Sequence, residues 1–186
     1  MKNILYLTLI ISFASFLSSC SKSSGSDSGY YLKASFDGTA KSFNSVPVIA
    51  VKSWDGTGNY NLYITGFSNL PTSGIPTSNT EEASLTLWSD KDDFIAGKTF
   101  TSVEVNGVPV NNFVYVSVGT NPIPGNSWTS TYDFSSVKES FSCTITEVTS
   151  TYIKGSFSTT IYQGVESPIV SKNVTNGEFY AKITAP

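Results

Sequence analysis

The chain has 186 residues, of which 13% are charged and 13% are aromatic, and it contains no histidine. The lack of histidine excludes His-dependent metal sites and His-dependent nucleophiles. All 11 basic residues are lysines, which excludes arginine clamps for phosphate or carboxylate. No P-loop or other cofactor motif occurs, so we expect no cofactor and no metal. The net charge of −3 argues against nucleic acid as a partner.

Residues 1–19 have the pattern of a secretory signal peptide. Lys2 precedes an apolar run from Ile4 to Leu17, which is too short for a membrane span of about 20 residues. The run closes with Leu17-Ser18-Ser19-Cys20, which resembles the bacterial lipobox, where the cysteine thiol is diacylated and the preceding peptide bond is cut. The alternative is an ordinary cleavage site that leaves Cys20 as a free thiol. We expect lipidation of Cys20, whose acyl chains would hold the mature protein to a membrane.

Residues 20–29 are predicted to form a flexible tether, because the Ser/Gly-rich stretch after Cys20 has no apolar side chain to bury. Its span would be roughly 15–20 Å, which holds a domain just off a bilayer. Ser21, not Asp, follows the cysteine, which resembles lipoproteins of the outer membrane more than those retained in the inner membrane. Asp27 is the only acidic residue of the tether, so exposure on the outer surface stays open.

Residues 30–186 have the length of a single domain, and their pattern predicts strands separated by Gly, Pro, Asn and Asp turns. Alternation over 30–36 leads into the turn Asp37-Gly38, and Asn106-Gly107 is the strongest hairpin signal in the chain. No window has a sustained helical period, so we expect little or no helix after Cys20. The predicted fold class is all-β, a single antiparallel β-sandwich with a barrel as the alternative. The predicted strands are residues 30–36, 46–53, 60–67, 83–88, 103–110, 113–118, 139–148, 152–162 and 177–183, with long loops at 68–80 and 119–127.

Acylation of Cys20 would leave Cys143 as the only other cysteine, so no intramolecular disulfide is expected. Cys143 alternates with Phe141 and Ile145, a pattern typical of a side chain that packs in the core as a small hydrophobe. A reactive thiol is the alternative, but no neighbouring cation in the sequence would lower the pKa of Cys143.

Three closing segments, Ser142–Thr146, Ile153–Ser158 and Val174–Phe179, carry a Gly-Ser-Phe-Ser and a Thr-Asn-Gly-x-Phe motif, and the domain opens with Phe36-Asp37-Gly38 followed by Phe43. These motifs resemble those of a group of small Bacteroidetes lipoproteins. The resemblance implies an anchored all-β domain, with glycines where the backbone turns or approaches closely and phenylalanines that pack. The group has no assigned activity, so no functional residue is carried over from it.

Three tryptophans at predicted strand ends are candidate ligand-binding residues. Trp54 precedes Asp55, Trp88 comes shortly before Asp90, and Trp128 leaves the proline-containing loop. A flat ring beside hydrogen-bonding side chains is what a sugar-binding surface needs. The alternative is that each ring caps the core under a loop.

Acidic residues give two further hypotheses. Asp90 and Asp92 occupy the first two positions of an EF-hand-like loop, but Phe94 takes the third, so a solvated turn is the better interpretation. Two facing carboxylates could serve a glycosidase without any histidine. The candidate acids lie in separate strand patterns, and the sequence brings no two of them together: Glu104, Glu139, Glu147 and Glu178.

These observations lead to three candidate functions. The first is a non-catalytic binding module for a glycan or another cell-surface ligand, suggested by the anchor, the tether and the Trp/polar turns. The second is a structural or adhesion lipoprotein that binds a protein partner through the edge of its sheet. A glycosidase-like enzyme ranks third, because no catalytic residue can be assigned.

Overall fold

The computed structural model describes residues 29–71, 73–75, 79–105, 108–117, 127–130, 140–163 and 170–185. The predicted signal peptide, Cys20 and most of the tether lie outside this part, as do Glu139 and most of the predicted loop 119–127. The described residues form strands and turns without any helix, as expected. Accordingly, none of them belongs to a helix that could span a membrane.

The strands follow one another closely along the chain. In order they are β1 (Tyr31–Phe36), β2 (Thr39–Ser42), β3 (Ile49–Trp54), β4 (Tyr60–Ser68), β5 (Glu81–Ser89), β6 (Thr99–Thr101), β7 (Glu104–Val105), β8 (Val108–Pro109), β9 (Asn112–Ser117), β10 (Ser127–Thr129), β11 (Ser142–Val148), β12 (Tyr152–Gln163) and β13 (Val170–Thr184).

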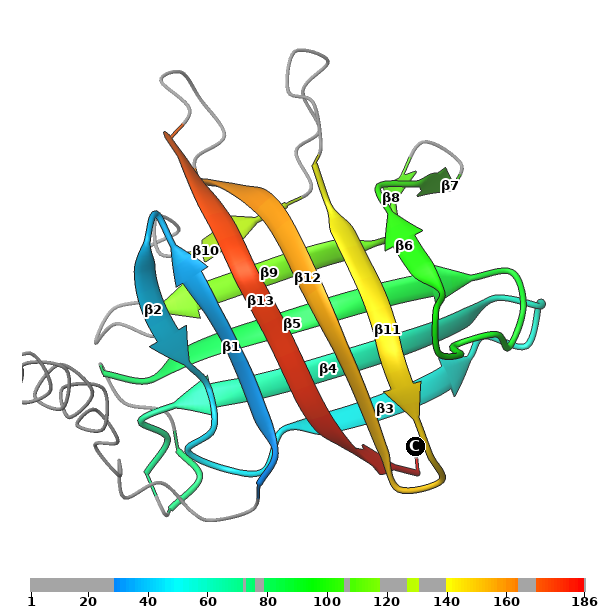
Figure 1. Ribbon diagram of the computed structural model, residues 1–186, viewed down its shortest axis with the longest axis horizontal. Coiled ribbons are helices and arrows are strands. Elements are labelled where there is room, and N and C mark those ends of the chain that lie inside the picture. The colour runs from blue at the N-terminus through cyan, green and yellow to red at the C-terminus, as the bar shows by residue number, and fades with distance from the viewer. Residues whose placement is uncertain are drawn as a thin grey trace, which may run out of the picture.

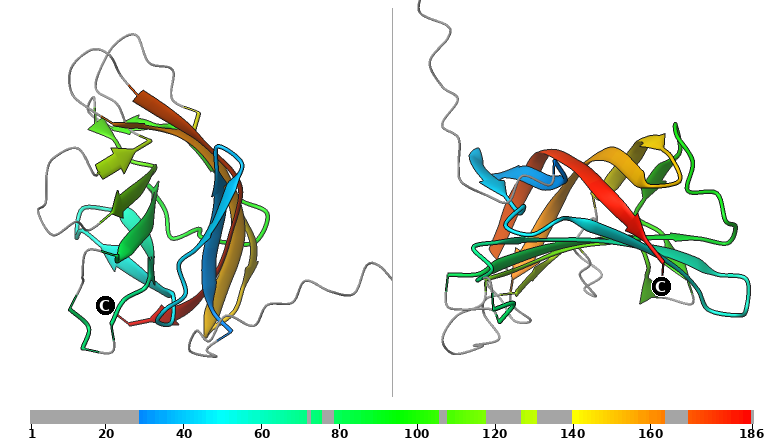
Figure 2. Two further views of the ribbon diagram at one scale, coloured as in Figure 1. Left: turned by 90° about the vertical axis from the view of Figure 1, so that its left-hand side faces the viewer. Right: turned by 90° about the horizontal axis from the view of Figure 1, so that it is seen from below.

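One sheet of 11 strands, in the order β2-β1-β13-β3-β4-β5-β9-β10-β12-β11-β6, makes up the domain, and β7 and β8 form a separate hairpin. The sheet folds over so that β1, β13, β12 and β11 cross over β3, β4, β5 and β9 (Figure 1). Seen from the side, the two groups face each other as two layers (Figure 2). We call β2, β1, β13, β12, β11 and β6 the front layer and β3, β4, β5, β9 and β10 the back layer. The predicted all-β domain is confirmed.

Two long strands join the layers at opposite corners. β13 pairs with β1 and β12 in the front layer, and its last residues, from Lys182 to Thr184, pair with β3 of the back layer. At the other corner Tyr162 of β12 pairs with Thr129 of β10. The pairing of β13 with β3 is parallel, so the sheet is mixed and not purely antiparallel.

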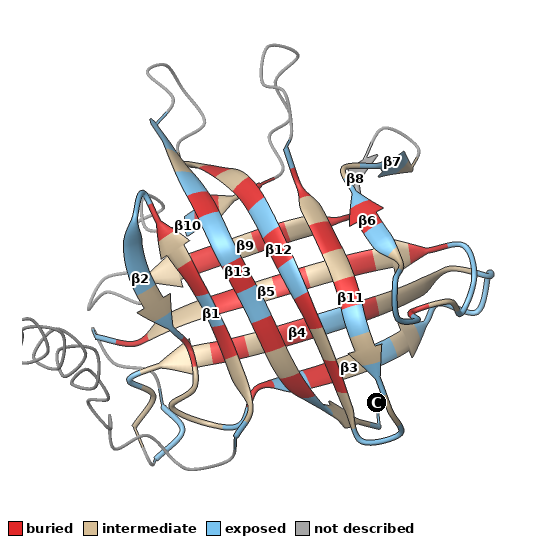
Figure 3. Cartoon of the chain, in the orientation of Figure 1, coloured by how far each residue is buried: buried red, intermediate tan, exposed pale blue. Residues whose placement is uncertain are grey.

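The core lies between the two layers and is filled by alternate side chains of the longer strands, visible as the red bands in Figure 3. Ala83, Leu85 and Leu87 of β5 are fully buried, as their alternation predicts. Among the described residues, the buried hydrophobic side chains of the core come from residues 32–181. The largest fully buried side chains are Phe43, Phe113, Phe179, Leu32, Ile64, Leu85, Leu87, Ile145, Ile153, Ile161, Val48 and Val174.

Cys143 is part of this core, as its alternation predicts. The residue is fully buried and lies between the buried residues Phe141 and Ile145. Burial raises the pKa of the Cys143 thiol to about 12, because the thiolate would lose its hydration. The thiol therefore stays protonated and unreactive at neutral pH.

Two glycine–phenylalanine pairs link β12 to β13. Gly155 pairs with Phe179, and Phe157 pairs with Gly177. Both strands therefore carry a Gly-x-Phe segment, and because the strands are antiparallel, the glycine of each segment lies opposite the phenylalanine of the other. A Cβ atom on Gly155 would lie against the Phe179 ring and 2.5 Å from the Thr144 carbonyl oxygen. Each ring therefore occupies the place of the side chain that the opposite glycine lacks.

A polar cluster ties the β1–β2 hairpin to the back layer. Lys41 Nζ lies 2.6 Å from Glu81 Oε1 and 3.1 Å from the Tyr115 hydroxyl, which itself donates to Glu81 over 2.6 Å. Burial alone would lower the pKa of Lys41, but the hydrogen bonds to Glu81 and Tyr115 outweigh it and raise this pKa. The cluster is thus a half-buried ion pair that spans the two layers.

The structure has the two predicted hairpin turns, but several of its strands were not predicted. Asp37 and Gly38 both have positive φ, 47° and 84°, as a two-residue hairpin turn requires. The hairpin around Asn106-Gly107 is confirmed by the pairing of β7 with β8. The prediction missed β2, β6 and β10, and it began the last strand at Gly177 although β13 begins at Val170.

Candidate functional site

The three tryptophans do not share one surface. Trp54 ends β3 and is 62% exposed. It pairs with Tyr60, which pairs with Ser89, so these side chains point to one side of the back layer. Trp88 precedes Ser89 in β5 and therefore points to the opposite side.

Trp128 belongs to the core. Its side chain is only 8% exposed and packs with the buried hydrophobic residues of both layers. The ammonium group of Lys172 lies 4.5 Å from the ring centroid and covers the remaining side of the ring. The structure thus corrects the assignment of Trp128 as a ligand-binding residue.

Asp55 is held by its own turn. Its carboxylate accepts hydrogen bonds from the Asn59 side chain at 2.5 Å and from the Thr57 backbone N–H and hydroxyl at 2.8 Å each. The bonds from Asn59 and Thr57 lower the pKa of Asp55 well below its usual value. Both carboxylate oxygens serve the β3–β4 turn, so Asp55 has a structural role in this turn.

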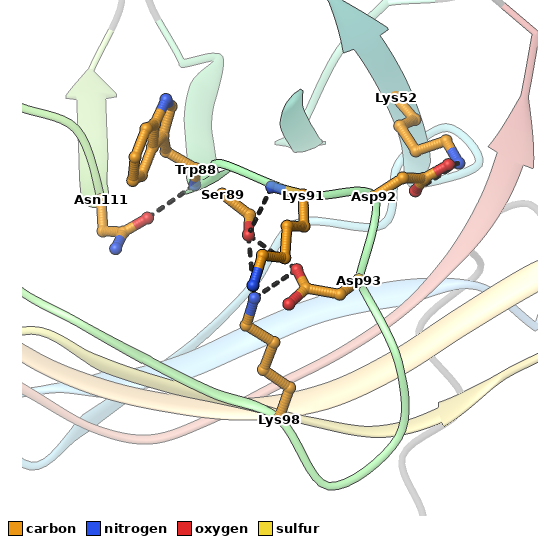
Figure 4. A network of polar contacts seen from close by, with 8 residues as sticks. All are labelled: Lys52, Trp88, Ser89, Lys91, Asp92, Asp93, Lys98 and Asn111. Carbon is orange, nitrogen blue, oxygen red and sulfur yellow. Dashed lines mark hydrogen bonds and ion pairs between the residues drawn. The ribbon is translucent and has the colours of Figure 1, made fainter. Parts of the chain in front are cut away.

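The acidic loop after β5 is also structural (Figure 4). Asp92 pairs with Lys52 of β3 at 2.7 Å, and Asp93 pairs with Lys98 and accepts a bond from Ser89 at 2.6 Å. Asp90 is exposed. In the part of the chain that the structure describes, no three acidic or cysteine side chains are grouped as a metal site would need.

The contact between Lys98 and Ser89 does not form a nucleophile. Lys98 donates to the Ser89 hydroxyl at 2.9 Å, but it is also ion-paired with Asp93. The hydrogen bond from Lys98 lowers the pKa of Asp93, so the carboxylate is ionised. An ammonium group has no lone pair for the Ser89 proton, and Ser89 is buried.

The outer side of the front layer carries polar side chains arranged in rows. Strand pairing aligns Lys33, Glu178, Ser156, Thr144 and Thr99 across β1, β13, β12, β11 and β6. All five point away from the core because their strand neighbours are buried. We use the name polar face for Lys33, Ser35, Ser42, Ser142, Thr144, Ser156, Ser158, Asn176 and Glu178.

Two shallow depressions of about 320 and 370 Å³ lie side by side on the polar face. Asn176 and Glu178 line both of them and so form the ridge between them. The first depression is otherwise lined mainly by hydroxyl side chains on β11 and β12, and the second by Lys33, Ser35 and Ser42 with their neighbours on β1 and β2.

Asn176 is placed on the ridge by an irregularity of β13. The pairing of β13 shifts against β12 after Phe157 and against β1 after Lys33, so the bulge opposes both neighbouring strands. Asn176 has φ of 51°, a left-handed conformation that asparagine tolerates better than most residues. Among the described residues, none forms a hydrogen bond with the Asn176 side chain.

Several hydroxyls of the polar face point to solvent. Within the described part of the chain, the side chains of Ser142, Ser156 and Ser158 form no hydrogen bond with protein groups, whereas Thr144 pairs with Thr99 at 2.8 Å. Glu178 is ion-paired with Lys33 at 3.0 Å, and both side chains are about half exposed. The polar face therefore offers donors and acceptors with little net charge.

Tyrosine rings border the polar face. Tyr31 and Tyr180 pair across β1 and β13, with ring centroids 6.1 Å apart, and Tyr152 of β12 lies 5.1 Å from Tyr180. The Lys154 ammonium group lies 5.0 Å from the centroids of Tyr152 and Tyr180 and 2.7 Å from Glu147. This tyrosine row adds half-exposed aromatic surface next to the hydroxyls.

The sequence analysis did not assign the polar face, although its signal is present in the chain. Ser142-x-Thr144 and Ser156-x-Ser158 alternate with core residues, as strands with one solvated side do. The Thr-Asn-Gly segment marks a bulge inside a strand. Both patterns are also typical of strands that have only a structural role, so the sequence alone does not mark them as a site.

Compared with known proteins, the chain matches no protein-family model, no curated protein and no solved structure.

Proposed function

We propose that the protein is an exported, membrane-anchored lipoprotein whose β domain binds a glycan on the polar face. The observation that carries this proposal is the pair of depressions that share Asn176 and Glu178. The glycan would contact the tyrosine row and the hydroxyl side chains, and not the tryptophans.

The chemistry of the polar face suits a ligand with many hydroxyl groups. Serine and threonine hydroxyls can donate or accept, Asn176 can do both, and Glu178 accepts. The nearby tyrosine rings offer apolar surface for the C–H groups of a sugar. Phosphate or another strong anion is disfavoured, because Glu178 offsets the charge of Lys33.

Both depressions are shallow, so each protein molecule should bind weakly. A ligand on an open surface keeps much of its hydration and gains little buried area to offset the cost of association. Many copies anchored on one membrane would gain affinity by avidity, which suits attachment to a repetitive glycan.

The glycan site can be tested with Asn176→Gly. This substitution removes the ridge side chain but keeps a residue suited to positive φ. Loss of one or two hydrogen bonds at about 0.5–1.5 kcal/mol each should weaken glycan binding by about 2–150-fold. A glycan array should first identify a ligand for the domain of residues 29–186, and calorimetry should then compare the variant with the unmodified domain. The melting temperature should stay nearly unchanged.

Asn69→Gly is the matched control, since Asn69 is also exposed and has φ of 52° but lies at the end of β4, away from the polar face. It should bind the glycan normally. Equal affinities of Asn176→Gly and the unmodified domain would remove the polar face from consideration, and so would a glycan array without any ligand.

A glycosidase is not favoured by the described carboxylates. Glu147 is paired with Lys154 and Glu178 with Lys33. The hydrogen bond from Lys154 lowers the pKa of Glu147, whereas a general acid needs a raised pKa.

The proposed anchor has its own test. Cys20→Ala should abolish incorporation of a labelled fatty acid and release the protein from the membrane fraction, because each buried CH₂ of an acyl chain contributes about 0.8 kcal/mol to binding. Cys143→Ala serves as the control and should keep its label, since Cys143 is buried in the core. Label that persists in Cys20→Ala would contradict the lipobox assignment.

A further inference from the structure

The two depressions of the polar face follow one another across the strands and not along one of them. The first is lined by residues of β11, β12 and β13, and the second by residues of β13, β1 and β2. Their middle strands, β12 and β1, both pair with β13 and so lie two strand spacings apart, or about 10 Å. This distance is longer than one sugar ring, so a monosaccharide can occupy only one depression at a time.

The side chains that could contact a sugar are also aligned across the strands. Lys33 pairs with Glu178, and Glu178 pairs with Ser156, so these three residues form one row. Two residues further along β1 and β13, Tyr31 pairs with Tyr180 and begins a parallel row of tyrosine rings. A chain of sugar units that crosses the strands can therefore contact hydroxyl groups in both depressions and aromatic surface along its length.

We infer that the polar face binds a neutral, linear oligosaccharide that crosses β12, β13 and β1 and places sugar units in both depressions. The inference rests on the proposed glycan function and adds to it the minimum size, the direction and the charge of the ligand.

The ridge between the depressions suits the passage of such a chain. Asn176 is exposed, and its amide group has two N–H donors and an acceptor oxygen. Because Asn176 lines both depressions, it can donate to a sugar unit in one and accept from a unit in the other. Glu178, which shares the ridge, is held by its ion pair with Lys33 and adds acceptor oxygens.

The charges around the depressions favour a neutral oligosaccharide. Both lysines that line the second depression are already paired, Lys33 with Glu178 at 3.0 Å and Lys41 with Glu81 at 2.6 Å. Of the described residues that line the first depression, Glu178 alone is charged. A uronic acid or a sulfated sugar would thus meet a carboxylate without gaining an unpaired cation.

Calorimetry with oligosaccharides of increasing length is the direct test, on the full-length protein in a detergent without sugar head groups. The probes are linear oligomers of glucose, mannose, galactose, xylose and N-acetylglucosamine, each from the monomer to the hexamer. For a series that binds, the affinity should rise about tenfold or more until both depressions are filled, and then stay level. The affinity should change less than about twofold between about 50 mM and about 500 mM salt, because no net charge is recognised.

Two variants each block one depression. Ser156→Ile fills the first and Ser42→Ile the second with a side chain that suits a strand but forms no hydrogen bond. Each variant should bind long oligomers only about as tightly as the unmodified protein binds the monomer. Ser171→Ile is the matched control, since Ser171 is also an exposed serine of the front layer but lines neither depression, and it should keep the full gain with length.

The outcomes separate this inference from the glycan function on which it rests. Binding that does not strengthen with length, or a gain that survives either Ser42→Ile or Ser156→Ile, would overturn the two-depression ligand and leave glycan binding in place. A gain that Ser171→Ile removes equally, or affinity that falls steeply with salt, would overturn it as well. If no probe of any length binds, the glycan function fails, and the inference fails with it.

Discussion

Replacing Trp128 by alanine is expected to lower the free energy of unfolding by about 3–5 kcal/mol. The indole ring is buried between the layers and covered by Lys172, so its removal leaves a cavity that short β10 has little capacity to close. Chemical denaturation of residues 29–186 should show this as a lower midpoint with an unchanged slope.

Trp54→Ala is the control for Trp128→Ala. Trp54 is 62% exposed, so its replacement should change the free energy of unfolding by less than about 0.5 kcal/mol. The comparison holds the chemical change constant and varies only burial. Equal losses for the two variants would mean that Trp128 does not occupy the core.

Gly155→Ala is expected to destabilise the domain by about 1–3 kcal/mol or more, although alanine is the smallest possible addition. The new Cβ would lie 2.5 Å from the Thr144 carbonyl oxygen and against the Phe179 ring. Ring rotation can relieve only the second contact, because the first involves the backbone of the neighbouring strand. Thermal unfolding should report the loss as a lower melting temperature.

Ser156→Ala is the matched control for this change. Ser156 is the next residue of β12 and points to solvent on the other side of the sheet, so its effect should be within about 0.5 kcal/mol. Adding Phe179→Leu to Gly155→Ala should not restore the stability of the unmodified domain, since the contact of the new Cβ with the Thr144 carbonyl oxygen persists. A melting temperature for Gly155→Ala equal to that of Ser156→Ala would contradict the close packing of β12 and β13.

Much of the fold could be predicted because its local signals are strong. Asp37-Gly38 and Asn106-Gly107 mark hairpins, and the alternation of Ala83, Leu85 and Leu87 identifies the inner side of β5. The strands β6 and β10 were missed because each has three residues, too few for a periodic pattern. The start of β13 was missed because Ser171, Lys172 and Asn173 are three consecutive polar residues, which breaks the apolar–polar alternation.

The candidate site was less predictable, because it depends on which strands lie side by side. Asn176 and Ser142 line the same depression, yet no short-range pattern indicates that β11, β12 and β13 are neighbours in this register. Burial was also decided by tertiary contacts. Trp54 and Trp128 have similar polar neighbours in the sequence, but one lies at a sheet corner and the other under the opposite layer.

The place of β13 between β1 and β12 also determines when the domain can fold. During synthesis β1 emerges early, but its partner β13 is the last strand to appear, so contact order is high. The β1–β2 hairpin must wait with an unpaired edge until the C-terminal segment arrives, and β3 waits for the same strand at the other corner. A chain whose first strands pair with its last strand closes slowly, and this non-local closure leaves a period in which chaperones can bind.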